Sequence, residues 1–365
     1  MAFIFILSLA YLGANLVIYN QMILTFNTLG KTEKIISGIL YWTMTLSFFI
    51  PFVVKSGNIV LMKTASTIGG LWLIGTLYMT ILLLVCKLLK LFIRSFKHGF
   101  FISATITILI LTYGYINNIH IHRQYIDIAT DKKMDRPLKI VAVSDIHLGY
   151  LTGQKHCKKI VETINSEKAD LILIAGDLID SNIEPVKNAH MEDELQKLDA
   201  NYGVYMVPGN HDHHSGIENC HKFAEAAGIT LLTDSIVVID KQIQIIGRDD
   251  YSNRLRKEIE TLISKIDTNI LTIVIDHQPW QLKRVSELPI DLQISGHTHN
   301  GQIFPLNLII KHLYEQGYGY RKWDKDSHIY VSSGISLWGP PVRIGTVNEM
   351  AVFRIGSTHE TSHNS

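Results

Sequence analysis

The sequence predicts an all-α membrane domain followed by an α/β domain, and two observations carry this prediction. Charge is divided sharply along the chain, because residues 1–30 contain no Asp, Glu, Lys or Arg and Glu33 is the only acidic residue among the first 120. Beyond that point, short apolar runs rich in β-branched residues alternate with amphipathic segments, which is typical of an α/β layered domain. We therefore expect a transmembrane domain at 1–118, an α/β domain at 119–356 and a disordered polar tail at 357–365.

Four apolar stretches predict transmembrane helices, at about 2–20, 35–54, 68–86 and 100–117. Each is close to the ~20 residues that a helix needs to cross the hydrocarbon core. The first stretch lacks a positively charged start and runs into more apolar sequence, which disfavours a cleaved signal peptide. The other three lack the polar face of a soluble helix. The stretches contain no Asp or Glu at mid-depth, which favours an anchor in the lipid bilayer over a transporter.

Basic residues between these stretches predict the side of the membrane on which the α/β domain lies. The most basic loop joins the third and fourth stretches and holds Lys87, Lys90, Arg94 and Lys97. The first loop has two lysines, Lys31 and Lys34, and the second also has two, Lys55 and Lys63. Because basic loops remain in the cytoplasm, four spans would place both the N-terminus and the α/β domain outside it.

Charge and cysteine content restrict the possible partners. The net charge is +1 and no basic stripe occurs, so we expect no nucleic-acid partner. Cys86 lies in an apolar stretch, and Cys157 and Cys220 share no short metal-binding spacing. We expect ordinary thiols, with a disulfide between Cys157 and Cys220 left open. The sequence leaves the oligomeric state open as well.

The elements of the α/β domain can be assigned in order. His120–Ile128 partly alternates polar and apolar residues and predicts an edge strand. Further strands are expected at 138–143, 171–175, 204–207, near 230 and 237, at 243–246, 270–275, 292–294, 328–331 and 350–355. Helices are expected at 158–164, 184–198, 217–227 and 252–265.

Polar side chains directly follow five of these strands. They are Asp145 and His147, Asp177, Asn210 and His211, His277, and His297 and His299. Sites in open α/β sheets gather at the carboxyl ends of strands, so we expect the five segments to converge. Oxygen and imidazole donors without thiolates suit Mn, Fe, Zn or Co. In an extended segment, residues two apart face the same side of the chain. The side chains of Asp145 and His147 would then point in a common direction, and so would those of His297 and His299.

Glycine precedes three of these groups, as Gly176, Gly209 and Gly296. We expect these glycines where the backbone turns sharply and packs close to the site.

The motifs DIH, GDLID, GNHD, DH and GHTH occur in this order between about residues 138 and 355, and this order resembles the calcineurin-like metallophosphoesterase superfamily. The strings DHQPW and GHTHNGQ resemble its membrane-associated bacterial branch and the transmembrane metallophosphoesterase-domain proteins. That branch often has glycine where this chain has Asn300. The resemblance implies a four-layer α-β-β-α metallophosphoesterase sandwich over 119–356, in an integral protein of a bacterial cell membrane.

The resemblance also implies two divalent metal ions. Asp145, His147 and His299 would bind the first ion, and Asn210, His277 and His297 would bind the second. Asp177 would bridge them, because a carboxylate can present one oxygen to each ion. Paired ions in such sites lie ~3.5–4 Å apart and activate a water for in-line attack on phosphorus.

His211 and Asp212 are the expected catalytic pair outside the metal ligands. The resemblance to the superfamily implies that His211 lies near the leaving oxygen of the substrate and donates a proton to it. Asp212 would orient the His211 imidazole, and Asp180 is a further candidate for such support.

Other residues near these motifs have ordinary explanations. We expect surface or core roles for the remaining histidines, with the two that follow GNHD as the main exceptions: His190, His213, His214, His221, His312, His328, His359 and His363. Asp276 is expected to be a structural carboxylate. Gln302 would either bind substrate or close its loop. Arg343 could meet a phosphate, but a surface cation is favoured.

Three functions fit these observations. The first is a membrane-anchored phosphoesterase that cleaves a phosphomonoester, phosphodiester or pyrophosphate, in a lipid-linked or cell-envelope substrate. The resemblance extends to hydrolases of nucleotide-diphosphate lipids, which would require a site that faces the cytoplasm. The second is a catalytically silent membrane scaffold or sensor for a phosphorylated ligand, which an intact His211 disfavours. The third, a transporter with a phosphatase appendage, is disfavoured by the charge-free stretches.

Overall fold

The computed structural model describes residues 2–54, 57–93, 98–323 and 327–357, and it divides into two compact units. One unit comprises Met1–Asn117 together with Gly339–Ile344, and the other comprises Asn118–Trp338 together with Gly345–Ser365. Beyond Ser357, the expected disordered tail lies outside the described residues, as do Lys55, Arg94 and Lys97 of the loops.

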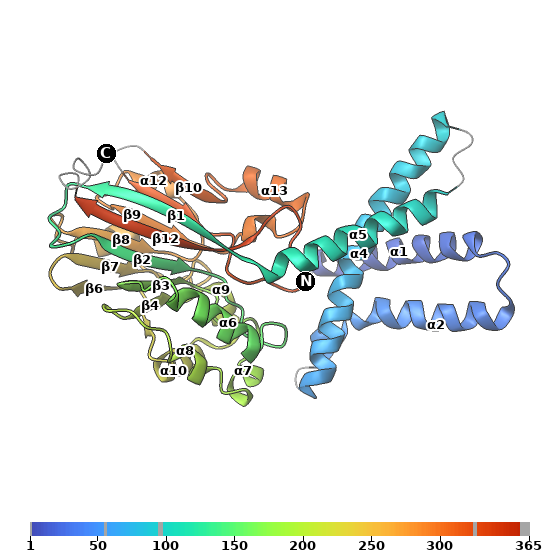
Figure 1. The fold of residues 1–365 in the computed structure, drawn as a ribbon, viewed down its shortest axis with the longest axis horizontal. Coiled ribbons are helices and arrows are strands. Elements are labelled where there is room, and N and C mark those ends of the chain that lie inside the picture. Colours follow the sequence, from blue (N-terminus) through green and yellow to red (C-terminus); the bar gives the residue numbers. More distant parts are fainter. Residues whose placement is uncertain (1, 55–56, 94–97, 324–326, 358–365) are drawn as a thin grey trace. The chain divides into compact units, whose positions relative to one another are not determined.

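The first unit is helical (Figure 1). Its helices are α1 (Ala2–Thr25), α2 (Lys31–Ser47), α3 (Ile50–Val53), α4 (Ile59–Phe92) and α5 (Gly99–Ile119). Among the described residues, three helices are long and apolar enough to cross a membrane: Phe5–Thr25, Ile59–Phe92 and Gly99–Ile119.

The predicted count of four spans is therefore not confirmed, and the difference lies in the second apolar stretch. The chain over 35–54 is divided, because α2 ends at Ser47 and Pro51 belongs to the separate short helix α3. The first turn of α2 is also charged, with Lys31, Glu33 and Lys34. α2 is 17 residues long, which is less than the ~20 residues of a typical span.

Asn15 joins three helices of this unit through one buried side chain. Its Oδ1 accepts hydrogen bonds from the Tyr41 hydroxyl at 2.9 Å and from Trp72 Nε1 at 3.0 Å. The hydroxyls of Thr45 and Thr76 donate to the same oxygen, at 3.2 and 3.3 Å. Polar groups away from water must be satisfied internally, and such bonds hold membrane helices together.

Arg343 lies in the segment Gly339–Ile344 of this same unit, and its side chain is fully buried. Its backbone N–H donates to the Gly114 carbonyl at 3.0 Å, and Asn117 Nδ2 donates to the Arg343 carbonyl at 3.1 Å. The prediction of a surface cation is therefore wrong, because the segment is packed against helix backbone.

The second unit contains two mixed six-stranded sheets. The first sheet has the order β1-β12-β2-β3-β4-β5, and the second has the order β10-β11-β9-β8-β7-β6. The strands of the first are β1 (Ile121–Thr130), β2 (Leu138–Val143), β3 (Leu171–Ala175), β4 (Val204–Val207), β5 (Thr230–Leu231) and β12 (Asn348–Ser357). Those of the second are β6 (Ser235–Ile239), β7 (Ile243–Gly247), β8 (Leu271–Ile275), β9 (Leu292–Ser295), β10 (Gly319–Lys322) and β11 (His328–Val331).

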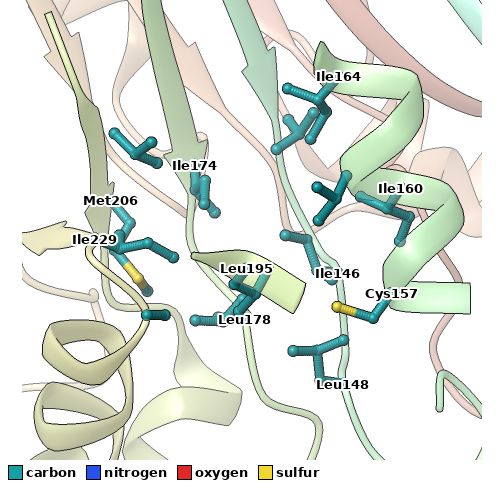
Figure 2. Packing of buried hydrophobic residues seen from close by; sticks show 14 of the residues in the cluster. Ile146, Leu148, Cys157, Ile160, Ile164, Ile174, Leu178, Leu195, Met206 and Ile229 are labelled. Atoms are coloured by element: carbon teal, nitrogen blue, oxygen red, sulfur yellow. The ribbon is translucent and has the colours of Figure 1, made fainter. Parts of the chain in front are cut away.

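Apolar side chains form a core on each face of these sheets. One core includes Val141, Ile172 and Met206 of the first sheet, and it is covered by α6 (Gln154–Asn165), α8 (Glu192–Leu195) and α10 (Ile217–Ala226). Figure 2 shows Ile160 and Ile164 of α6 facing this layer. The opposite face of the same sheet, through residues such as Ile140 and Leu173, packs with Ile245 and Ile273 of the second sheet.

A third core covers the outer face of the second sheet. It joins Ile246 and Val274 to Leu262 of α11 (Ile259–Ile263) and to Val285 of α12 (Leu282–Ser286). Helices therefore lie outside a pair of packed sheets, as in a four-layer α/β arrangement.

Most strand predictions are confirmed, whereas several helix predictions are not. The strand at β1 lies at the edge of its sheet as expected, and β2, β3 and β4 match their predicted bounds. The helix expected over 184–198 is two short helices, α7 (Glu184–Asn188) and α8, because His190 between them has a positive φ. The helix expected over 252–265 is only α11, and the preceding residues form a loop.

Candidate metal centre

The expected site residues all follow strands that run parallel to at least one neighbouring strand that also carries site residues. Asp145, Asp177 and Asn210 come after β2, β3 and β4, and these three strands are mutually parallel. His277 and His297 come after β8 and β9, which are also parallel to each other. Carboxyl ends of parallel strands share one edge of a sheet, and this topology brings the segments together.

A first group of donor atoms consists of Asp145, His147 and His299. Nε2 of His147 lies 3.1 Å from Nε2 of His299. Asp145 Oδ1 lies 3.4 Å from His299 Nε2 and 3.8 Å from His147 Nε2. All three side chains are buried. Two imidazole nitrogens on one ion at about 2.0–2.1 Å lie about 3.0–3.4 Å apart, so this triangle has the dimensions of a metal site.

A second group consists of Asp177, Asn210, His277 and His297. His277 Nε2 lies 3.1 Å from Asp177 Oδ2 and 3.2 Å from Asn210 Oδ1. The rings of His277 and His297 are 5.2 Å apart at their centroids. Asp177, His277 and His297 present donor atoms within 4.8 Å of one another, which is close enough to share one ion.

Asp177 belongs to both groups. Its Oδ2 lies 3.1 Å from Nε2 of His277 and 3.8 Å from Nε2 of His147, which stands in the first group. Its Oδ1 accepts the backbone N–H of His211 at 2.8 Å. One oxygen of Asp177 thus faces histidines from both groups, while the other is held by the backbone.

Hydrogen bonds fix the orientation of the His277 imidazole. Its Nδ1 lies 2.8 Å from the carbonyl oxygen of Ala175, which can only accept, so Nδ1–H donates and Nε2 faces the site. Burial lowers the pKa of His297 to about 4, which keeps that imidazole neutral and able to bind a metal. Burial would raise the pKa of Asp177, but the neighbouring His277 lowers it well below its usual range, so this carboxyl is ionised.

The backbone around these residues is not extended, and the geometric reason given for pairing Asp145 with His147 is therefore wrong. Five of the seven expected ligands have positive φ: Asp145 (55°), His147 (49°), Asp177 (54°), His297 (70°) and His299 (48°). Such angles are uncommon for residues other than glycine and cost of order 1–3 kcal/mol each. Left-handed residues therefore follow β2, β3 and β9, whereas Asn210 after β4 and His277 after β8 have ordinary negative φ.

Glycines leave room for this convergence. A Cβ at Gly209 would lie 2.1 Å from Asp177 Oδ1, and one at Gly296 would lie 2.5 Å from Asp145 Oδ2. A Cβ at Gly176 would lie 2.5 Å from His277 Nδ1, and only this one of the three has a positive φ, of 83°. Close approach therefore requires all three glycines, whereas the sharp turn applies to Gly176 alone.

The expected catalytic residue His211 lies beside the first group. Its ring is 4.8 Å from that of His147 at the centroids. Its Nδ1 donates to the carbonyl oxygen of Asp180 at 2.5 Å and lies 3.5 Å from Asp180 Oδ1. Nδ1 is therefore occupied, and Nε2 is the nitrogen available for chemistry.

Asp212 does not orient His211, which corrects the prediction for this pair. The Asp212 carboxylate is fully buried and accepts three backbone N–H groups, from Leu178, Ile179 and Gly209. It therefore joins the turn after β3 to the turn after β4, which carry Asp177 and Asn210. The support predicted for His211 comes from Asp180 instead.

Several residues for which the sequence suggested a structural role, rather than a role in the site, have a structural role here. Asp276 accepts Arg248 Nη1 at 2.9 Å and also pairs with Arg256, so it is a structural carboxylate. Gln302 closes its loop, because its side chain exchanges two hydrogen bonds with the Trp338 backbone, at 2.9 and 3.0 Å. Cys157 and Cys220 are buried free thiols, so no disulfide joins them.

The remaining histidines lie outside the two donor groups, or outside the described residues. His213 Nε2 lies 2.7 Å from Asp249 Oδ1, and the ring of His214 is 5.9 Å from that of His211. His328 lies 2.6 Å from the Tyr320 hydroxyl. His359 and His363 are not among the described residues.

Two features of this region were not predicted. The Trp338 ring lies 5.9 Å from that of His211, and no spacing in the sequence indicated this contact. β7 is also followed directly by polar residues, Arg248, Asp249 and Asp250, at the same edge as His277. The rule that polar residues after strands mark a site would have found this sixth segment.

Comparison with known proteins identifies the family. Residues 138–301 match the model of the calcineurin-like phosphoesterase family. The chain is 31% identical to the uncharacterized metallophosphoesterase YkuE of Bacillus subtilis, over 60% of this chain and 80% of that protein. It is 38% identical to an uncharacterized metallophosphoesterase of Helicobacter pylori, over 61% of each chain, so it spans less than two thirds of that relative.

Another relative is named as a transmembrane protein. The chain is 27% identical to a transmembrane protein with metallophosphoesterase domain from Danio rerio, over 68% of this chain and 61% of that protein. The ordered motifs, the parallel strands that carry them and these matches together assign the chain to the calcineurin-like metallophosphoesterases.

Proposed function

We propose that this chain is a membrane-anchored phosphoesterase that uses two divalent metal ions. The observation that supports this most strongly is the position of Asp177 Oδ2, between His277 Nε2 at 3.1 Å and His147 Nε2 at 3.8 Å. A carboxylate between two sets of imidazoles suits a bridging ligand, and paired ions are common in phosphate ester hydrolases.

The residues present fit such a pair of ions. Asp145, His147 and His299 would hold one ion, Asn210, His277 and His297 would hold the other, and Asp177 would bind both. Nitrogen and oxygen donors without thiolates suit Mn, Fe, Zn or Co. When bound, these ions supply Lewis-acid chemistry, which neutralises charge on phosphoryl oxygens and lowers the pKa of water.

His211 acts on the leaving group in this proposal. Water attacks phosphorus and gives up one proton to solvent, the bond from phosphorus to the leaving oxygen breaks, and that oxygen takes a proton from His211 Nε2, which solvent then replaces. The Asp180 carbonyl holds Nδ1, and Asp180 Oδ1 lies 3.5 Å from the same nitrogen, which fixes the orientation of the ring. Such general acid help contributes ~10²–10⁴ in rate.

Because a membrane anchor would hold the active site close to the bilayer, we propose a lipid-linked or cell-envelope substrate. In the order of the chain, α5 follows the basic end of α4, with Lys87 and Lys90, and leads into β1 of the phosphoesterase domain. If that end lies in the cytoplasm, α5 carries the domain to the other side, whether the chain has three spans or four. An active reporter that works only in the cytoplasm, fused after Ser365, would contradict this orientation.

The direct test is hydrolysis of bis(p-nitrophenyl) phosphate with added Mn²⁺ by the full chain in detergent, compared with Asp177→Asn. Metal-dependent turnover that the variant loses supports the phosphoesterase. Absence of turnover on this and on other aryl phosphates would favour a scaffold or sensor that binds a phosphorylated ligand. A screen of lipid extracts then identifies the natural substrate class.

A further inference from the structure

A cavity lies between the loop that follows β7 and the segment around Trp280. Its volume is about 440 Å³, which is within the range of small-molecule sites. Its lining includes Arg248, Arg254, Arg256 and Lys257, together with the aromatic residues Tyr251 and Trp280. Four cations around one cavity indicate an anionic ligand.

The acidic side chains near this cavity are already engaged. Glu258, which also lines it, lies 3.2 Å from Arg284 Nη2. Asp276 accepts from Arg248 and Arg256 through the same oxygen, Oδ2. The positive charge of the cavity therefore exceeds the negative charge that its own residues supply.

Several of the cations have donor atoms without a partner. Arg248 and Arg256 side chains are only 9% and 8% exposed, yet the Nε atom of each is buried with no hydrogen-bond partner among the described residues. Arg254 is exposed and, within the described part of the chain, forms no hydrogen bond or ion pair. Lys257 Nζ reaches only a carbonyl oxygen, that of Asp234, at 3.2 Å. The Nε atoms of Arg248 and Arg256 are enclosed by the protein, whereas Arg254 and Lys257 are exposed and can donate hydrogen bonds to an anion in the cavity.

The aromatic residues provide an apolar wall. The Tyr251 and Trp280 rings lie 6.1 Å apart, and Trp280 packs against Tyr314 at 4.5 Å. Trp280 Nε1 donates to Gln278 Oε1 at 2.9 Å, which fixes the ring. A sugar or other ring attached to the anion could pack on this wall.

The cavity is one strand away from the metal ligands. β7 and β8 are parallel neighbours, Gly247 pairs with Ile275, and Arg248 and His277 follow these two strands directly. Neighbouring strands are about 4.8 Å apart, so the loop that lines the cavity and the segment that carries His277 start side by side at the same edge of the sheet.

We propose that this cavity binds a second phosphate group of the substrate, remote from the bond that is cleaved. The proposal rests on the proposed phosphoesterase function and names its substrate class: a phosphoester that carries another phosphate group. Arg254 and Lys257 determine the specificity for this second phosphate, whereas the nearly buried Arg248 and Arg256 form part of the cavity wall.

The test is inhibition of bis(p-nitrophenyl) phosphate hydrolysis by glucose 1,6-bisphosphate and by glucose 6-phosphate. The wild-type chain should bind the bisphosphate at least about 10-fold more tightly, because only the bisphosphate can reach both sites. Arg254→Gln/Lys257→Gln should reduce this ratio towards 1 and leave basal turnover unchanged. The control Lys158→Gln/Lys265→Gln, which removes two exposed cations elsewhere, should keep the ratio.

Calorimetry of the same ligands with the full chain separates this proposal from the phosphoesterase function. If turnover is absent but bisphosphate binding depends on Arg254 and Lys257, the result supports the phosphate-binding cavity and contradicts the phosphoesterase function. If turnover occurs and the two ligands inhibit equally, or the double variant keeps the ratio, the cavity proposal is wrong. Competition by phosphatidic acid vesicles that Arg254→Gln/Lys257→Gln loses, together with no competition by glycerol phosphate, would support the cavity and assign its phosphate to a lipid.

Discussion

The backbone N–H of His211 donates a hydrogen bond to Asp177 Oδ1 at 2.8 Å. The residue that we assign as general acid is thus fixed, through its own backbone, to the residue that we assign as the bridging ligand. The imidazole itself is held elsewhere, by the Asp180 carbonyl. Binding of metal and transfer of the proton can therefore be separated by mutation of the His211 side chain.

His211→Ala should keep its metal content and lose about 10²–10⁴ in kcat. The backbone contact with Asp177 remains, and only the proton donor is removed. Metal analysis of the purified variant, together with kcat on a phosphodiester, checks this. A variant that loses its metal but still cleaves activated esters would contradict the assignment.

Gly209→Ala should abolish activity and reduce metal content, because its Cβ would lie 2.1 Å from Asp177 Oδ1. The matched control is Gly153→Ala, since no atom lies within 4 Å of a Cβ at that position and its φ is −85°. Both variants are measured for turnover and bound metal. Equal effects at the two positions would show that close packing against Asp177 is unimportant.

Asp212→Asn should destabilise the phosphoesterase domain rather than alter proton transfer. An asparagine presents one N–H towards backbone groups that themselves donate, which leaves a buried donor unsatisfied at a cost of about 1–3 kcal/mol. We expect the Tm in detergent to fall by about 2–10 °C. Asp193→Asn, at an exposed position, serves as control. An unchanged Tm would contradict the anchoring role.

The Asp170 carboxylate should make stability depend on pH. Burial would raise the pKa of Asp170, but hydrogen bonds from Arg136, the Lys139 backbone and Asn201 lower it below its usual range. Because the folded-state pKa is the lower one, the stabilisation is present above the unfolded pKa of about 3.9 and is lost as pH falls through the folded pKa. Asp170→Asn should therefore have a lower Tm than wild type at pH 7, with a gap that narrows below about pH 4. A constant gap between pH 7 and pH 3 would contradict this.

The strands and the list of site residues could be predicted because each depends on local pattern. β2 is a six-residue run that is apolar except for Lys139, and β3 is a fully apolar five-residue run. The polar residues behind them reach one edge whenever such strands are parallel. The left-handed turns at Asp145 and His147 could not be predicted, because neither residue type requires a positive φ. They are imposed by tertiary contacts, such as the bond from the His147 N–H to the Asp177 carbonyl.

The role of Asp212 was misread for a related reason. Adjacency to His211 suggested contact between the two side chains, but successive residues of α9 (Asn210–His214) point in different directions around a helix. Asp212 faces inward to the backbone of Leu178 and Ile179, while His211 faces Asp180. Contacts across 30 residues of chain are not visible in the order of the sequence.

The most direct test of the account is the number of metal ions bound per chain. Elemental analysis of the wild-type protein purified with Mn²⁺ should give two ions, since Asp177 Oδ2 faces the histidines of both groups. Asp177→Asn should lose at least one ion together with all metal-dependent turnover. One ion in the wild-type chain, or two ions retained by the variant, would contradict a centre bridged by Asp177.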